Sequence, residues 1–454
     1  MKNEALFRTG SVWRAIFTMA VPSVVIIFVM FLYNIADMFF VGCLGDTAQV
    51  AAVSVVGPVF SILAAAATML GAGGCTIIAR CFGAGEVEKG RVYSSLCCWA
   101  GTLLGVLVCA ILLLCGTPLL RMLGSTPETT AYALQYLRVL AVGSPFLILA
   151  NTAAMLLRAE GAVKDGLIGN LLGTVTNLLL DPLFILAFRW GVTGAAAASV
   201  LGNVVATGFY MCYIIRKGTV LTVDPRFALQ KPAALGEILV IGLPNGIGSL
   251  LSGFASTFSN RLLSAYGTGA IAAMAAAGKT TMLIGMITMA ICMGCQPLLA
   301  YSYGAGDKRR LRELLKNIGL LTMGIGLAAG VACLLGRKAL IGMFIKEAAV
   351  TALGEKLVVW LVLGSPVIGL TYLATNLLQS VNKAMSAVVL SLLRQGLLLL
   401  PLLYGLNFFF GVTGIAAAHF AADTGRGTDR RRDAGAHTGR RSLLEGRPCK
   451  ECFR

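Results

Sequence analysis

Residues 191–216 read GVTGAAAASVLGNVVATGFYMCYIIR, and this stretch contains no charged residue before Arg216. A helix of about 20 apolar residues crosses the hydrocarbon core of a membrane, which is about 30 Å thick. The stretch therefore predicts a membrane-spanning helix. Its first four residues, Gly-Val-Thr-Gly, recur 220 positions later at 411–414, which indicates an internal repeat.

The composition of the whole chain agrees with a membrane protein. Hydrophobic residues make up 57% of its 454 residues and charged residues 13%, whereas soluble domains have about 45–50% and about 25%. This excludes a soluble enzyme, and no HExxH or GxSxG motif indicates a membrane enzyme. The net charge is +17. In membrane proteins, Lys and Arg residues flank the apolar spans, so this excess of positive charge does not indicate binding to nucleic acid, and we expect no nucleic-acid partner.

Twelve apolar segments divide into two sets of six. We therefore predict an all-α polytopic membrane protein with an N-lobe (1–216), a cytoplasmic linker (217–236) and a C-lobe (237–422). The predicted spans lie near 14–41, 49–79, 92–117, 132–157, 165–188, 191–215, 238–265, 269–301, 314–336, 354–379 and 384–406, and the last begins at Gly411.

The two halves match each other in register at several points. Pro22 is matched by Pro244, and the Gly-Ala-Gly turn at 83–85 and the Gly-Ser-Pro at 143–145 each recur 221 positions later. Because each half has an even number of spans, both lobes face the same way, as in transporters built from parallel repeats. This arrangement predicts a cavity between the two lobes.

The twelfth span is shorter than the repeat requires. Residues 411–436 read GVTGIAAAHFAADTGRGTDRRRDAGA, and the apolar pattern stops near Ala422. A helix from 411 to 422 is about 18 Å long, so the last helix of the C-lobe is expected to be a truncated stub. Residues 423–454 then form a basic tail, which is either disordered or the product of a shifted reading frame.

The distribution of lysine and arginine predicts the orientation. With a cytoplasmic N-terminus, eighteen of these residues flank the spans on the inside and seven on the outside. Cytoplasmic loops carry an excess of Lys and Arg. We therefore expect a multi-pass inner (plasma) membrane protein with its N-terminus in the cytoplasm.

Two acidic residues lie well inside predicted spans, at Asp37 and Asp181. A carboxylate at the centre of a span costs about 2.5–3.5 kcal/mol to insert and commonly marks an ion or proton pathway. Asn34 and Asn177 lie three and four residues before the two acids, so each shares a helix face with its neighbouring acid. A carboxylate with an amide can hold a proton or Na⁺. The alternative is that each aspartate only bonds a neighbouring helix.

Other motifs have simpler interpretations. Pro22 and Pro244 fall inside the first helix of each half, where proline frees a backbone carbonyl and permits a bend, or simply packs. Residues 273–280 loosely match a phosphate-binding loop but lie in an apolar helix, so we expect no nucleotide cofactor. The Cys-x-x-Cys at 449–452 lacks two of the four ligands of a closed zinc site. We expect no metal beyond Na⁺ at Asp37, Asn177 and Asp181.

Taken in order, these features resemble the MATE (multidrug and toxic compound extrusion) family over residues 10 to about 422. The resemblance rests on the twelve-span plan, residues 33–42 (YNIADMFFVG), the paired Gly-Ala-Gly turns, and residues 156–161 (LLRAEG) leading to Asn177 and Asp181-Pro182. The in-span acids lie only in the N-lobe, which resembles the DinF-type branch more than the NorM-type branch. The second lobe offers polar amides instead, at Asn260, Gln296, Asn376 and Gln379.

This resemblance implies a secondary active antiporter that exports amphiphilic organic cations in exchange for H⁺ or Na⁺ by alternating access. It implies a cation-coupling site at Asp37, Asn177 and Asp181, with Asn34 and Ser199 beside them. We expect a monomer whose partners are the transported cations, the coupling ion and membrane lipid.

Two alternatives stay open. A flippase for lipid-linked precursors would need a basic cavity for pyrophosphate, and the basic residues inside spans are Arg261, Lys279 and Arg394. The second alternative is that the chain is an inactive transporter, because its last helix is broken.

Overall fold

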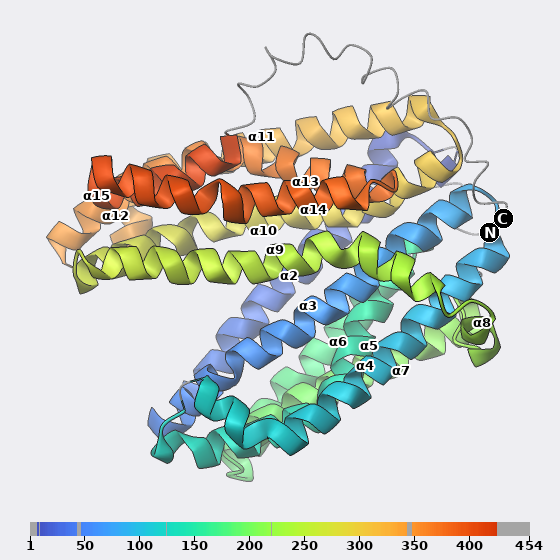
Figure 1. Cartoon of the computed structure of the whole chain (residues 1–454), viewed down its shortest axis with the longest axis horizontal. Helices are drawn as coiled ribbons and strands as arrows, with labels where there is room; N and C mark the ends of the chain where they lie inside the picture. Colours follow the sequence, from blue (N-terminus) through green and yellow to red (C-terminus); the bar gives the residue numbers. More distant parts are fainter. Residues whose placement is uncertain are drawn as a thin grey trace.

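The computed structural model describes residues 7–8, 10–42, 47–123, 125–218, 220–342 and 347–424. In these residues the regular structure is helical, as the apolar runs predict, and the helices form two lobes (Figure 1). Ten of the described helices are long and apolar enough to cross a membrane, or eleven if one bent pair counts as a single span.

The N-lobe contains six spanning elements. Pro182 ends α6, and a short π-helix, η1, follows it directly. The elements are α2 (Val12–Gly42), α3 (Thr47–Gly83), α4 (Val87–Met122), α5 (Pro127–Ala159), α6 (Val163–Pro182) with η1 (Leu183–Ala187), and α7 (Val192–Lys217).

The C-lobe repeats this plan with more interruptions. The counterpart of α5 is broken into α12 and α13, which meet at 42° beside Gly364, and the predicted span 384–406 is divided by a second π-helix, η2. The elements are α9 (Ala234–Ser264), α10 (Thr268–Gly304), α11 (Lys308–Gly342), α12 (Ala348–Leu363), α13 (Ser365–Ser380), α14 (Ala384–Leu392), η2 (Leu393–Leu397) and α15 (Leu399–Thr424).

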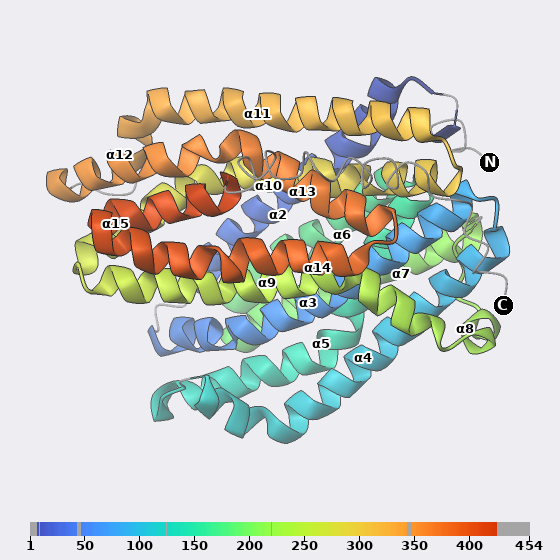
Figure 2. The same ribbon diagram turned by 45° about the horizontal axis from the view of Figure 1, so that its top comes forward.

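The last described helix shows the internal repeat in its backbone. Within α15, Gly411 has φ 58° and ψ −136°, and its repeat partner Gly191 has φ 58° and ψ −138°. These positive φ values are readily adopted by glycine. The non-helical φ and ψ of Gly411 divide α15 into two segments, and Figure 2 shows that α15 doubles back on itself. The second segment, 412–424, has roughly half the 26 residues of α7.

The linker is attached to the N-lobe. The hydroxyl of Ser95 donates to the carbonyl of Asp224 at 2.6 Å, and the indole Nε1 of Trp99 donates to the carbonyl of Val223 at 3.0 Å. The buried carboxylate of Glu160 accepts from the backbone N–H of Val220 at 2.8 Å. A short helix, α8 (Pro225–Gln230), follows. Residues 220–224 therefore form part of the N-lobe, and the connection between the lobes lies between α8 and α9.

The two lobes meet where α3 and α10 end, beside the linker, which we call the linker end (Figure 1). A Cβ added at Gly83 would lie 2.1 Å from the carbonyl oxygen of Tyr301, and one added at Gly304 would lie 2.1 Å from that of Arg80. The two contacts are repeat equivalents, 221 positions apart. The two backbones touch here because neither glycine has a side chain.

Aromatic side chains fill the same end. Phe7 is fully buried, and its ring centroid lies 4.8 Å from that of Tyr301 and 5.8 Å from that of Phe82. The rings of Phe82 and Tyr301 are themselves 5.3 Å apart. The lobes are therefore closed against each other at the linker end, and their helices diverge toward the opposite end (Figure 1).

Candidate functional site

A buried polar cluster lies in the N-lobe where α2, α6 and α7 meet. The side chain of Asp181 is fully buried and Asn177 is 3% exposed, and the two lie one turn apart on α6. The Nδ2 of Asn177 donates to the hydroxyl of Ser199 on α7 at 3.1 Å. That hydroxyl is also 3.2 Å from the phenol oxygen of Tyr33 on α2. Ser199 thus joins the three helices.

Two glycines bring the α6 and α7 backbones together at this cluster. A Cβ on Gly173 would lie 2.8 Å from the carbonyl oxygen of Gly202, and one on Gly202 would lie 2.6 Å from that of Gly173. Small residues allow such close approach between membrane helices. Asn177 follows Gly173 by one turn and Ser199 precedes Gly202 by three residues, so their side chains meet directly beside this contact.

The backbone changes immediately after Asp181. Pro182 closes α6, and η1 follows as a single π-helical turn. Single π turns inside helices occur frequently at functional sites. The buried carboxylate of Asp181 therefore lies directly at this irregularity of the backbone.

The sequence-predicted site is brought together in part. Asn177, Asp181 and Ser199 lie in one cluster, as the resemblance implied. The backbones of Asn34 and Asp37 belong to α2, but their side chains lie outside the described residues. The sequence reasoning missed Tyr33, although this residue sits one position before Asn34 and one helical turn before Asp37.

The chemistry of the cluster suits a small cation. The amide, hydroxyl and phenol of Asn177, Ser199 and Tyr33 are neutral and supply oxygen atoms. Asp181 lies one helical turn after Asn177 on α6. The Asn177 Oδ1 is buried and has no hydrogen-bond partner among the described residues. A carboxylate and a spare amide oxygen can hold Na⁺, which takes oxygen ligands, or the carboxylate alone can take H⁺.

A second buried polar cluster connects the lobes. The Nε2 of Gln296 on α10 donates to the hydroxyl of Thr76 on α3 at 2.9 Å and to Oε1 of Gln379 on α13 at 2.8 Å. All three side chains are at most 2% exposed. Gln296 and Gln379, two of the polar residues noted in the second lobe, therefore form an interlobe hydrogen-bond network rather than a copy of the acidic cluster.

The other polar and proline positions are distributed more widely. Asn376 is buried, whereas Asn260 is exposed, as are Arg261 and Lys279. Arg394 lies over the ring of Tyr372, with its guanidinium carbon 5.0 Å from the ring centroid. Pro22 and Pro244 are both buried, and α2 and α9 continue as helices across them.

Known proteins of one family match this chain over most of its length. The family model MatE matches twice, over residues 22–183 and 244–404, one match in each lobe. The multidrug export protein MepA of Staphylococcus saprophyticus is 30% identical over 93% of this chain and 94% of its own length. The protein of the same name from Staphylococcus aureus is 30% identical over 91% of this chain and 92% of its own length.

Solved structures share the fold. One is described as an outward-facing conformation of a multidrug resistance MATE family transporter, with a TM-score of 0.88 at 24% identity, covering 98% of this chain and 99% of the other. MATE structures described as straight and as bent each give a TM-score of 0.87 at 25% identity, covering 98% of this chain and 99% and 98% of theirs.

Proposed function

This chain belongs to the MATE family, and we propose that it is a multidrug efflux transporter that exports amphiphilic organic cations in exchange for H⁺ or Na⁺. The observation that carries the proposal is the fully buried side chain of Asp181 in a membrane helix. One turn before it on the same helix, the Oδ1 of Asn177 has no hydrogen-bond partner among the described residues. The relatives named multidrug export proteins support the substrate class.

The proposed exchange rests on competition for negative charge. A carboxylate buried in a span interacts strongly with a single cation, because a low dielectric screens the charges weakly. An incoming H⁺ or Na⁺ at Asp181 and Asp37 neutralises that charge and releases the organic cation. The membrane potential supplies about 2.3 kcal/mol per elementary charge per 100 mV, which drives the coupling ion inward.

The lobes supply the alternating access. With the linker end in the cytoplasm, as the Lys and Arg distribution predicts, the contacts of Gly83 and Gly304 close the cytoplasmic side. The described state is then outward-facing, in line with the outward-facing structure at a TM-score of 0.88. A rocking motion of the lobes would break the Gln296–Thr76 hydrogen bond and open the space between the lobes to the cytoplasmic side. Pro22 and Pro244, with the carbonyls they leave free, are the proposed bending points.

The placement in the cell follows the same reasoning. We place the protein in the inner (plasma) membrane as a monomer with a cytoplasmic N-terminus, in contact with lipid and with small-molecule cations. The branch within the family stays a prediction, with the DinF-type favoured by the acids of the N-lobe.

A separate proposal concerns the sequence at the end of the C-lobe. The segment after Gly411 repeats the start of α7, but the apolar sequence stops near Ala422, so we propose a shifted reading frame over 423–454. The coding DNA read in the other two frames should then show an apolar continuation after codon 422. If neither frame does so, the basic tail is genuine. Restoring an apolar stretch there should raise transport if the stub limits activity.

The function is tested by transport in vesicles. We expect proteoliposomes with the full chain to export a fluorescent organic cation when a pH or Na⁺ gradient is imposed, and to stop when the gradient is collapsed. If neither gradient drives export, the proposal is wrong. Transfer of a fluorescent lipid-linked precursor by the same preparation would then favour the flippase.

Ser199→Ala is expected to reduce this export roughly sevenfold, because the two hydrogen bonds it removes are worth about 0.6 kcal/mol each between membrane helices. Thr176→Val is the matched control, since among the described residues that hydroxyl bonds only the Leu172 carbonyl of its own helix, at 2.7 Å. Initial export rates measure both variants. Equal rates would mean that Ser199 has no part in the site.

A further inference from the structure

The first turn of α9 is tied to the N-lobe by a side-chain hydrogen bond. The hydroxyl of Tyr93 on α4 donates to the carboxylate Oε2 of Glu237 on α9. Tyr93 is buried, whereas Glu237 is exposed. Because α4 belongs to the N-lobe and α9 to the C-lobe, this bond joins the two lobes. It lies at the linker end, where α9 begins beside α8 (Figure 1).

The same stretch of α4 also holds the linker. Ser94 donates through its hydroxyl to the carbonyl of Thr222 at 3.1 Å, in addition to the bonds that α4 makes to Val223 and Asp224. The linker is therefore fixed to the N-lobe, and the connection between α8 and α9, residues 231–233, is the hinge between the lobes. The bonded glutamate lies four residues beyond this hinge, so its bond to α4 crosses the hinge.

Close backbone packing brings the glutamate to the tyrosine. A Cβ on Gly73 of α3 would collide with the carbonyl oxygen of Ile238, the residue that follows Glu237. Small residues allow such close approach between membrane helices. The first turn of α9 is thus pressed against the N-lobe in the closed state. A hydrogen bond to an ionised acceptor is stronger than one between neutral groups, which favours the bond to this carboxylate.

The internal repeat does not contain a second copy of this bond. The equivalents of the bonded tyrosine and glutamate are Leu314, 221 positions later, and Ala15, 222 positions earlier. Both are fully buried and apolar. Near them, the Nη1 of Arg310 on α11 donates to the backbone carbonyl of Gly10 at 3.0 Å. The linker end is therefore held by a different polar contact on each side, and the carboxylate lies on the side of the hinge.

We propose that the Tyr93–Glu237 hydrogen bond is a latch that stabilises the state closed at the linker end. This inference rests on the lobe movement in the proposed function and does not depend on the substrate or the coupling ion. When the lobes separate at the linker end, the first turn of α9 moves away from α4 about the hinge, and the bond breaks. The linker stays with α4.

The latch is tested by hydroxyl-radical footprinting of the purified full chain in phosphatidylcholine nanodiscs, which measures the access of water to side chains and needs no transport. The reporters are Phe82 and Tyr301, which are 6% and 5% exposed in the closed state, and mass spectrometry quantifies their oxidation. Tyr93→Phe removes the hydroxyl and keeps the ring. We expect the oxidation rate of both reporters to rise about fivefold, the effect of one hydrogen bond whose acceptor is exposed to water.

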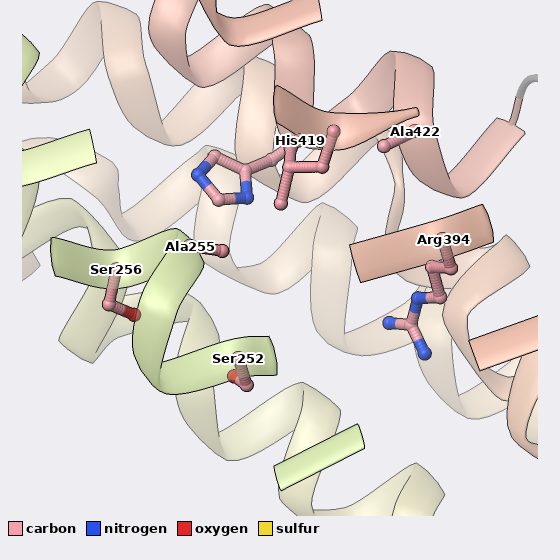
Figure 3. A pocket seen from close by; sticks show the side chains of 7 residues that line it. Ser252, Ala255, Ser256, Arg394, His419 and Ala422 are labelled. Carbon is pink, nitrogen blue, oxygen red and sulfur yellow. The ribbon is translucent and has the colours of Figure 1, made fainter. Parts of the chain in front are cut away.

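Two control variants leave the latch intact. Tyr213→Phe makes the same change on α7, where the tyrosine ring lies against Lys217 of its own helix. Ser256→Ala changes α9 itself, at a side chain that lines a cavity inside the C-lobe between α9, η2 and α15 (Figure 3). Both variants should keep the wild-type oxidation rates of the two reporters.

A second variant tests the acceptor. Glu237→Ala should raise the oxidation of the reporters by a similar factor, and the double variant with Tyr93→Phe should add little, because either change alone removes the whole bond. Additive effects of the two changes would mean that the pair forms no latch.

The remaining outcomes separate this inference from the proposed function. If Gly304→Ala raises the oxidation of the reporters and Tyr93→Phe does not, the lobes move but the latch does not exist. If Tyr93→Phe raises the oxidation in a chain that exports no dye under either gradient, the latch stands and the export function is refuted. If none of these variants raises the oxidation, the latch and the lobe movement are both wrong.

Discussion

Asp181→Asn is expected to abolish gradient-driven export of organic cations while leaving the protein folded. Asparagine has nearly the same shape but cannot take up H⁺ and carries no charge to attract Na⁺ or an organic cation. Two unit charges 4 Å apart interact by about 4 kcal/mol at an effective dielectric constant of 20, which is more than a hundredfold in binding. Initial export rates in proteoliposomes measure the loss.

The stability of this variant separates function from structure. Removing a charge from the interior of a span favours insertion, so the melting temperature should stay the same or rise. Asp165→Asn is the matched control, because Asp165 lies in the first turn of the same helix and away from the cluster. Export at half the wild-type rate or more by Asp181→Asn would show that the carboxylate only supports the packing of α6.

Gly304→Ala is expected to prevent closure at the linker end. The added Cβ would lie 2.1 Å from the carbonyl oxygen of Arg80, and because this atom is backbone, no side-chain rotation relieves the clash. The lobes must separate there. Cys81, 7% exposed in the closed state, should then react with a membrane-impermeant maleimide about tenfold faster, which corresponds to a shift of about 1.4 kcal/mol.

The control lies on the same helix. A Cβ at Gly285 meets no atom within 4 Å, so Gly285→Ala should leave the labelling of Cys81 unchanged. Mass spectrometry of the Cys81 peptide quantifies labelling in both variants. If Gly304→Ala labels no faster than Gly285→Ala, the glycine contact does not hold the linker end closed.

Much of the fold is predictable from the sequence, because each apolar run indicates a spanning helix and the internal repeat indicates two similar halves. The Gly-Val-Thr-Gly at 191–194 and 411–414 predicts an internal repeat, and Gly191 and Gly411 adopt the same backbone conformation with positive φ. The placement of Asn177 near Ser199 follows from the family resemblance, and its physical cause is the glycine pair of α6 and α7. Helical spacing alone does not reveal that pair.

The arrangement of the lobes is not predictable in this way. Gln296 and Gln379 are noted in the sequence as polar residues of the second lobe, but the hydrogen bond from Gln296 to Thr76 depends on how α3 crosses α10. Hydrophobic periodicity fixes which residues face lipid or protein and does not fix the angle between two bundles. The break at Gly364 is hidden for the same reason, since the matching Gly-Ser-Pro in α5 lies within a continuous helix.

The most direct test of coupling at the N-lobe carboxylates is equilibrium binding of a fluorescent organic cation to the purified full chain. The dye is titrated at increasing H⁺ and, separately, at increasing Na⁺. We predict that at least one of these ions raises the apparent Kd in proportion to its concentration, and that Asp181→Asn removes this dependence. A wild-type Kd that stays constant in both titrations would contradict competition between substrate and coupling ion.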